Sequence, residues 1–171
     1  MTAFRLGLTG SIGMGKSTTS GLFAAEGVPV WDADAAVHRL YAPGQPAALV
    51  IGAMFPDAID RDGRVDRPRL RALIQVDPTV LDRLNAAVHP LVAEDRARFL
   101  AVNADAPIVL LDVPLLYETG LDAACDAVAV VTASPEVQRE RVLMRGMTEA
   151  GFQLILSRQM ADAEKRARAD Y

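Results

Sequence analysis

The sequence has a single cysteine, no long apolar run and no excess of basic residues, and each of these absences excludes a class of protein. A single cysteine, Cys125, excludes an intrachain disulfide and is typical of a reducing compartment. No stretch approaches the roughly 18 apolar residues that a membrane span needs. Residues 1–9 also lack the basic n-region of a secretory signal. We therefore expect a cytoplasmic protein with no membrane partner.

Basic residues are not in excess either. The chain has 18 Lys and Arg against 22 Asp and Glu, a formal net charge of −4. Nucleic-acid-binding faces are basic because they must attract phosphates, so we expect no nucleic-acid partner. With 171 residues, 51% of them hydrophobic, the chain is expected to form one globular domain with a sizeable core. We expect a monomer or a weak homo-oligomer.

What the sequence does contain is a glycine-rich segment that follows an apolar run. Residues 10–18 read G-S-I-G-M-G-K-S-T, which fits the phosphate-loop pattern G-x-x-x-x-G-K-[ST]. Glycines let the backbone approach a triphosphate, and the loop N–H groups face the anion. Lys16 adds charge for the β- and γ-phosphates, and the Ser17 hydroxyl is a candidate Mg²⁺ ligand. The motif predicts nucleotide binding but does not separate a kinase from a GTPase or a motor. The residues expected to bind the nucleotide are Gly10, Ile12, Gly13, Met14, Gly15, Lys16, Ser17 and Thr18.

Apolar runs at four places predict strands, and the segments between them predict helices. Continuous β-branched runs are typical of strands buried on both faces of a parallel sheet. We therefore predict an α/β, P-loop NTPase fold with a mainly parallel central sheet flanked by helices. The predicted strands span residues 4–9, 28–32, 107–112 and 127–132.

The segment between the second and third predicted strands has no strand pattern. Leu81, Leu84 and Val88 recur there at helical spacing, and the segment is much longer than a crossover requires. It predicts a helical insertion, which is either an acceptor site or a structural elaboration. We expect one domain with three parts: a nucleotide-binding core of about 1–36, 106–134 and 163–171, a helical acceptor subdomain of about 37–105, and a lid of about 135–162.

Three aspartates lie at or just beyond the ends of predicted strands. Asp32 and Asp34 follow the second strand, and Asp112 ends the third. Ligands of open α/β sheets bind at this edge, and phosphoryl transfer needs a carboxylate to accept the hydroxyl proton and a group to help hold Mg²⁺. For each aspartate, a helix cap or turn is an equally good interpretation, Asp34 included.

Basic residues gather after the fourth predicted strand. For most of them a solvated helix face is the better interpretation. Arg145 differs because it precedes Gly146-Met147-Thr148, a predicted break between helices, where an arginine can close over a triphosphate. His89 also has two interpretations: it is a structural histidine, or it faces the acceptor just before Pro90, which is expected to start a helix.

Four blocks together resemble the dephospho-coenzyme A kinase family. They are the segment Gly7–Thr18, the triplet Asp32-Ala33-Asp34, the run His89-Pro90-Leu91-Val92, and the run Asp112-Val113-Pro114-Leu115-Leu116-Tyr117-Glu118. The last two are much more specific than the phosphate loop, and the blocks span nearly the whole chain. The resemblance implies transfer of the ATP γ-phosphate to the ribose 3′-hydroxyl of dephospho-CoA, the final step of coenzyme A biosynthesis.

The resemblance also implies roles for individual residues. Asp34 would be the general base at the 3′-hydroxyl, while Lys16 and Arg145 would neutralise the transferring phosphoryl group. Ser17 would hold Mg²⁺, with Asp112 as an indirect partner. The inserted helices would form the CoA-binding subdomain. The acceptor pocket would be lined by His89, Pro114, Leu115, Leu116 and Tyr117.

Two other classes of function remain open from the sequence. One is another small P-loop kinase, acting on a nucleotide or a small alcohol. The other is a GTPase-like switch or a regulatory ATP-binding module, although the 171 residues contain no N-K-x-D motif for guanine. Residues 169–171 are expected to enter a fifth strand, which family members continue beyond this point.

Overall fold

The computed structural model describes residues 2–171. These residues form two compact units, one of residues 2–32 with 102–171 and one of residues 33–101. No helix within residues 2–171 is long and apolar enough to cross a membrane.

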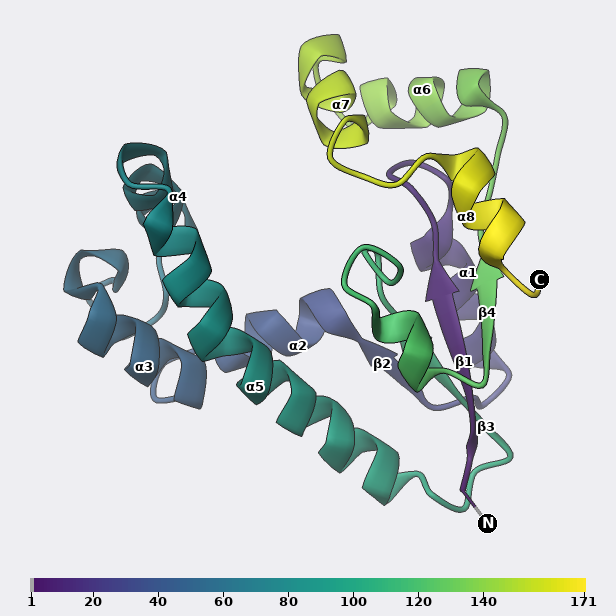
Figure 1. Cartoon of the computed structure of the whole chain (residues 1–171), viewed down its shortest axis with the longest axis horizontal. Coiled ribbons are helices and arrows are strands. Elements are labelled where there is room, and N and C mark those ends of the chain that lie inside the picture. Colours follow the sequence, from purple (N-terminus) through teal and green to yellow (C-terminus); the bar gives the residue numbers. More distant parts are fainter. Residues whose placement is uncertain (1) are drawn as a thin grey trace. The chain divides into compact units, whose positions relative to one another are not determined.

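The first unit is built on a four-stranded sheet with the strand order β2-β3-β1-β4 (Figure 1). The strands are β1 (Phe4–Thr9), β2 (Val30–Asp32), β3 (Ile108–Asp112) and β4 (Ala127–Val130). Every neighbouring pair is parallel, which confirms the predicted α/β fold. All carboxyl ends therefore share one edge, where Asp32 and Asp112 are register partners on adjacent strands.

Apolar strand residues make the core of this unit. Val109, Leu110 and Leu111 of β3 are at most 2% exposed, as expected for a central parallel strand covered on both faces. The helices of the unit are α1 (Lys16–Ala25), η2 (Leu121–Ala124), α6 (Pro135–Met144), α7 (Glu149–Leu156) and α8 (Asp162–Arg168).

The turn between α6 and α7 has defined ends. Ser134 caps α6 by accepting a hydrogen bond from the Val137 N–H, and Thr148 caps α7 by accepting one from the Gly151 N–H. Gly146, between them, has φ of +84°, a left-handed conformation that ends a helix at little steric cost for glycine. The predicted helix break after Arg145 is confirmed.

The second unit is helical and has its own core. It consists of α2 (Ala33–Leu40), α3 (Pro46–Met54), η1 (Pro56–Ala58), α4 (Arg67–Val76) and α5 (Thr79–Val102), of which the last residue is counted with the first unit. Ile51, Leu84 and Val88 are among its buried side chains. Arg39 of α2 and Asp95 of α5 form an ion pair at 2.9 Å, which ties these two helices together.

The expectation that Pro90 starts a helix is wrong, because Pro90 lies inside the 24-residue helix α5. The helix begins at Thr79, where the Asp77 carboxylate accepts hydrogen bonds from the Thr79 N–H and hydroxyl at 2.9 and 2.7 Å. An internal proline loses one helical hydrogen bond and costs about 3 kcal/mol. Burial of Val88, two residues earlier, is part of the packing that offsets this cost.

The last residues of the chain run along the edge of β4. The Asp170 N–H donates to the Val128 carbonyl, and the Val130 N–H donates to the Tyr171 carbonyl, at 2.9 and 3.0 Å. The Asp170 carboxylate also accepts from the Val128 N–H at 2.9 Å. Residues 170–171 thus use the hydrogen-bonding edge of β4, where the sequence predicts the entry to a fifth strand.

Candidate active site

The phosphate loop joins β1 to α1 and owes its shape to glycine. Gly15 caps α1 with φ of +104°, and Gly13 has φ of +78°, both in the region that side chains other than glycine rarely adopt. A Cβ at Gly13 would also lie 2.6 Å from Val142 Cγ2 and 2.9 Å from the Gln138 carbonyl oxygen. The loop therefore needs glycine both for its backbone conformation and for close packing against α6.

Two glutamines hold the peptide groups of Ile12 in this loop. Gln138 of α6 donates to the Ile12 carbonyl at 2.7 Å, and the Ile12 N–H donates to Gln159 Oε1 at 3.1 Å. Gln138 is only 6% exposed, so loss of its bond to Ile12 would leave a buried polar group without this partner. The phosphate loop is thereby connected to both ends of the α6–α7 segment.

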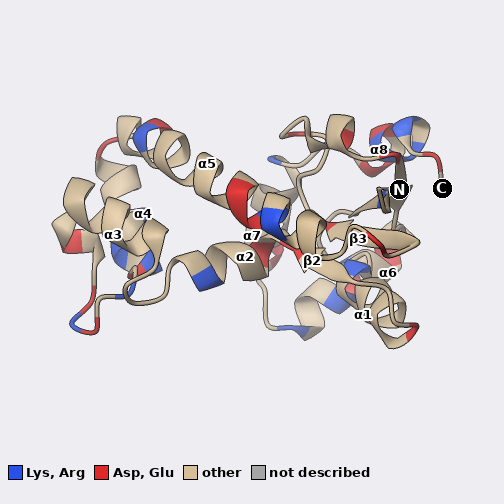
Figure 2. Cartoon of the chain, turned by 90° about the horizontal axis from the view of Figure 1, so that it is seen from below, with Lys and Arg blue, Asp and Glu red and all other residues tan. Residues whose placement is uncertain are grey.

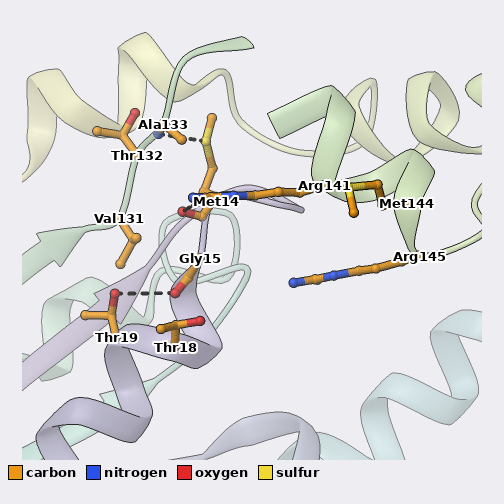
Figure 3. A pocket seen from close by; sticks show the side chains of 10 residues that line it. All are labelled: Met14, Gly15, Thr18, Thr19, Val131, Thr132, Ala133, Arg141, Met144 and Arg145. Carbon is orange, nitrogen blue, oxygen red and sulfur yellow. Dashed lines mark hydrogen bonds between the residues drawn. The ribbon is translucent and has the colours of Figure 1, made fainter. Parts of the chain in front are cut away.

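A pocket of about 600 Å³ opens beside the loop (Figure 3). Arg141 of α6 donates to the Met14 carbonyl at 3.4 Å, and the Met14 sulfur accepts from the Ala133 N–H at 3.1 Å. Arg145, the residue that ends α6, extends its guanidinium toward the loop in Figure 3. The residues that line the pocket are Met14, Gly15, Thr18, Thr19, Val131, Thr132, Ala133, Arg141, Met144 and Arg145.

The charged pair at the base of the loop consists of Lys16 and Asp112. Lys16 Nζ donates to Asp112 Oδ1, and the side chains are 14% and 2% exposed. Lys16 is the first residue of α1, and Asp112 is the last residue of β3. The pair places an ammonium group and a carboxylate at the sheet edge where a triphosphate with its metal ion is expected to bind.

The residues of the site fit a magnesium ion that arrives with a nucleotide. No cluster of three or more His, Cys, Asp or Glu residues that could hold a metal occurs within the described part of the chain. Mg²⁺ needs no such cluster in a phosphate site, because it keeps several waters and binds phosphate oxygens with one or two protein groups. Ser17, exposed in the first turn of α1, and Asp112 are the groups of this chain that suit such an ion.

The predicted acceptor residues lie on different elements. Asp34 is exposed in the first turn of α2, and since this helix begins at Ala33, Asp34 is inside it rather than at its N-cap. His89 is exposed on α5 of the same unit. In the first unit, Leu115 is 39% exposed, whereas Leu116 and Tyr117 are buried at 0% and 7%. The structure thus brings together the predicted nucleotide residues, Arg145 and Asp112, within the first unit.

Sequence reasoning missed several residues that the structure brings to the phosphate loop. Arg141 belongs to the basic group after the fourth predicted strand, for most of which a solvated helix face is the better interpretation, yet it lines the pocket. Gln138, Arg141 and Arg145 are three and four residues apart, so they lie on one side of α6, and this spacing was a usable signal. Gln159 had no such signal, because 147 residues separate it from Ile12.

A parallel sheet of order β2-β3-β1-β4, with a phosphate loop after β1 and arginines of the α6 segment beside that loop, is the nucleotide-binding core of a P-loop NTPase. The particular family follows from comparison. The family model of dephospho-CoA kinase matches residues 4–171, and the chain belongs to this family.

Relatives agree with this assignment, and solved structures share the fold. A dephospho-CoA kinase of Cereibacter sphaeroides is 64% identical over 172 residues, covering 100% of this chain and 86% of the relative. One from Jannaschia sp. is 59% identical, covering 99% and 87%. A Thermus thermophilus crystal structure superimposes with a TM-score of 0.88 at 35% identity, covering 99% of this chain and 86% of that one. The Campylobacter jejuni dephospho-CoA kinase shares the fold, with a TM-score of 0.73 at 21% identity and coverage of 98% and 85%.

Proposed function

We propose that this protein transfers the γ-phosphoryl group of ATP to the ribose 3′-hydroxyl of dephospho-CoA, giving CoA and ADP in the final step of coenzyme A biosynthesis. In this transfer the bond from the 3′-oxygen to the γ-phosphorus forms, and the bond from that phosphorus to the β,γ-bridging oxygen breaks. The observation that carries the proposal is the family match over residues 4–171, together with the phosphate loop and its Lys16–Asp112 pair.

On the donor side, the chain supplies positioning and positive charge. The loop N–H groups and the α1 N-terminus bind phosphate oxygens, while Lys16 and Arg145 neutralise the charge that develops on the transferring group. Ser17 and Asp112 would hold Mg²⁺, directly or through water, and the bound ion would supply positive charge beside the phosphates. The pocket beside the loop supports this role, because Arg145 and Arg141 line it. Residues 135–162 would then serve as a lid over the nucleotide.

On the acceptor side, Asp34 is the proposed general base, which accepts the proton of the 3′-hydroxyl. Its exposed carboxylate in the first turn of α2 is open to a substrate, as this role requires. We assign dephospho-CoA binding to the helical subdomain of about 37–105, with His89, and to the loop that carries Pro114, Leu115, Leu116 and Tyr117. We place the reaction in the cytoplasm, which the single cysteine supports. The protein is expected to act as a monomer or weak homo-oligomer.

The test is CoA formation from ATP, Mg²⁺ and dephospho-CoA, measured beside a panel of nucleoside monophosphates and small alcohols. Asp34→Asn removes the base and keeps the size of the side chain, so kcat should fall by roughly 10²–10⁴-fold. Asp57→Asn is the matched control, because Asp57 is an exposed carboxylate of the same helical unit. Turnover of a nucleotide without any CoA would instead favour the other kinase class.

A further inference from the structure

A buried positive charge lies in α8, outside the residues used so far. Lys165 is 0% exposed, whereas its neighbours Glu164 and Arg166 are exposed. The helix carries both acidic and basic residues, as Figure 2 shows. A buried ammonium group is costly unless it is paired and hydrogen-bonded, so its partners must be specific.

Both partners of Lys165 belong to the loop that follows β3. Its Nζ atom lies 2.9 Å from Glu118 Oε1 and donates to the Pro114 carbonyl at 3.1 Å. The Glu118 carboxylate also accepts from the Met160 N–H at 2.8 Å. Burial raises the pKa of Glu118, but hydrogen bonds from Lys165 and Met160 outweigh it, so the pKa lies below its usual value.

The Pro114 carbonyl is also tied to the phosphate loop. The Thr9 hydroxyl donates to it at 3.0 Å, and Thr9 is the residue immediately before Gly10. One carbonyl oxygen therefore accepts from the strand that leads into the phosphate loop and from α8. Because both groups donate to this one oxygen, the start of the loop after β3 is held at a fixed distance from the phosphate loop.

We propose that Lys165 is a positioning residue, which fixes the loop of residues 113–118 relative to the phosphate loop and so sets where the acceptor hydroxyl lies. The proposal rests on the proposed function, in which this loop lines the acceptor pocket. Lys165 touches neither the phosphate loop nor the pocket-lining residues of Figure 3 through any of these contacts. Its loss should therefore weaken use of dephospho-CoA and leave ATP binding nearly intact.

The test compares Lys165→Met, Glu118→Gln and the double variant, with Glu164→Gln as the control from the exposed side of the same helix. For Lys165→Met we expect kcat/KM for dephospho-CoA to fall about tenfold or more, because small misplacements of a substrate cost that much. The Kd of a non-hydrolysable ATP analogue should stay within about twofold of the parent value. The double variant should lose no more than Lys165→Met, since both groups act in one network.

Glu118→Gln keeps the size of the side chain and an acceptor oxygen but removes the charge that pairs with Lys165, so it tests the proposal even where Lys165→Met does not fold. It should raise the KM for dephospho-CoA with ATP affinity unchanged. Equal losses of ATP affinity and acceptor use, or no loss at all, would overturn the proposal.

Hydrogen exchange separates this proposal from the proposed function. The amides of Val113 and Thr119 are bonded within or next to the loop, to the carbonyls of Leu8 and Leu115. Lys165→Met should speed their exchange and leave those of α1 unchanged, whether or not the parent makes CoA. Unchanged exchange in this loop would show that Lys165 does not position it.

Discussion

Lys16 and Asp112 form an ion pair between the first residue of α1 and the last residue of β3. Asp112 is only 2% exposed, so its charge depends on the lysine for compensation. Lys16 is also the group expected to meet the β- and γ-phosphates. One contact therefore supports the folded protein and holds the ammonium group beside the proposed site of phosphoryl transfer.

In variants of this pair, stability and activity should respond differently. Lys16→Met leaves a buried carboxylate unpaired, which is expected to lower the free energy of unfolding by about 3–5 kcal/mol. The double variant Lys16→Met/Asp112→Asn should recover most of this loss, since the amide carries no charge. It should still be inactive, because the cation is missing. Urea titrations with CoA assays on the same samples check this, and equal stability of the single and double variants would contradict it.

Exchange of a glutamine for a glutamate should have unequal consequences at the two positions that hold Ile12. Gln159 acts as an acceptor from the Ile12 N–H, and a glutamate keeps that function. Gln138 acts as a donor to the Ile12 carbonyl, and a glutamate places two acceptors face to face. Titration of an ATP analogue should show a much larger loss of affinity for Gln138→Glu than for Gln159→Glu. Gln75→Glu, at an exposed site, is the control for the added charge.

The arginines of α6 allow a matched comparison. Both arginines are exposed, but Arg145 extends into the pocket, whereas Arg139 is paired with Glu149 at 2.8 Å. Arg145→Gln should reduce kcat by about 10²–10³-fold, as expected for loss of one group that stabilises transition-state charge. Arg139→Gln should change kcat little, because exposed ion pairs contribute at most about 1 kcal/mol. Comparable losses in both variants would remove Arg145 from the proposed mechanism.

Asp126 should make the stability of the folded protein sensitive to acid. Its carboxylate accepts from the Arg5 N–H and guanidinium at 2.7–3.0 Å, and these bonds lower the pKa of Asp126 from 3.8 to about 2. The folded-state pKa is depressed, so the contribution is present above pH 3.8 and is lost as the pH falls toward 2.

Asp126→Asn should therefore lower Tm at neutral pH, and the difference from the parent should shrink as the pH falls from about 4 to about 2. The effect should be modest, because the pair is partly exposed and screened by solvent. Asp105→Asn, at an exposed site, should give a Tm difference that does not change in this way. A constant Tm difference for Asp126→Asn over the same range would contradict the assignment.

Much of the fold could be predicted because its signals are local. The apolar runs of β1 and β3, the capping pair Ser134-Pro135 and the break at Gly146 each depend on a few adjacent residues. Pro90 shows the limit of such reasoning. Proline commonly opens a helix, so the sequence favoured a helix start there, but packing across α5 overrides this preference.

By itself, the sequence determined the phosphate loop, because the chemistry of that motif is contained in nine consecutive residues whose backbone needs glycine. Only the tertiary structure decided which side chains support it. Gln159 reaches Ile12 across 147 positions, and Lys165 reaches Pro114 across 51. A glutamine or lysine normally faces solvent, and only the packing of α8 and of the segment that precedes it against the rest of the first unit gives these two side chains their partners.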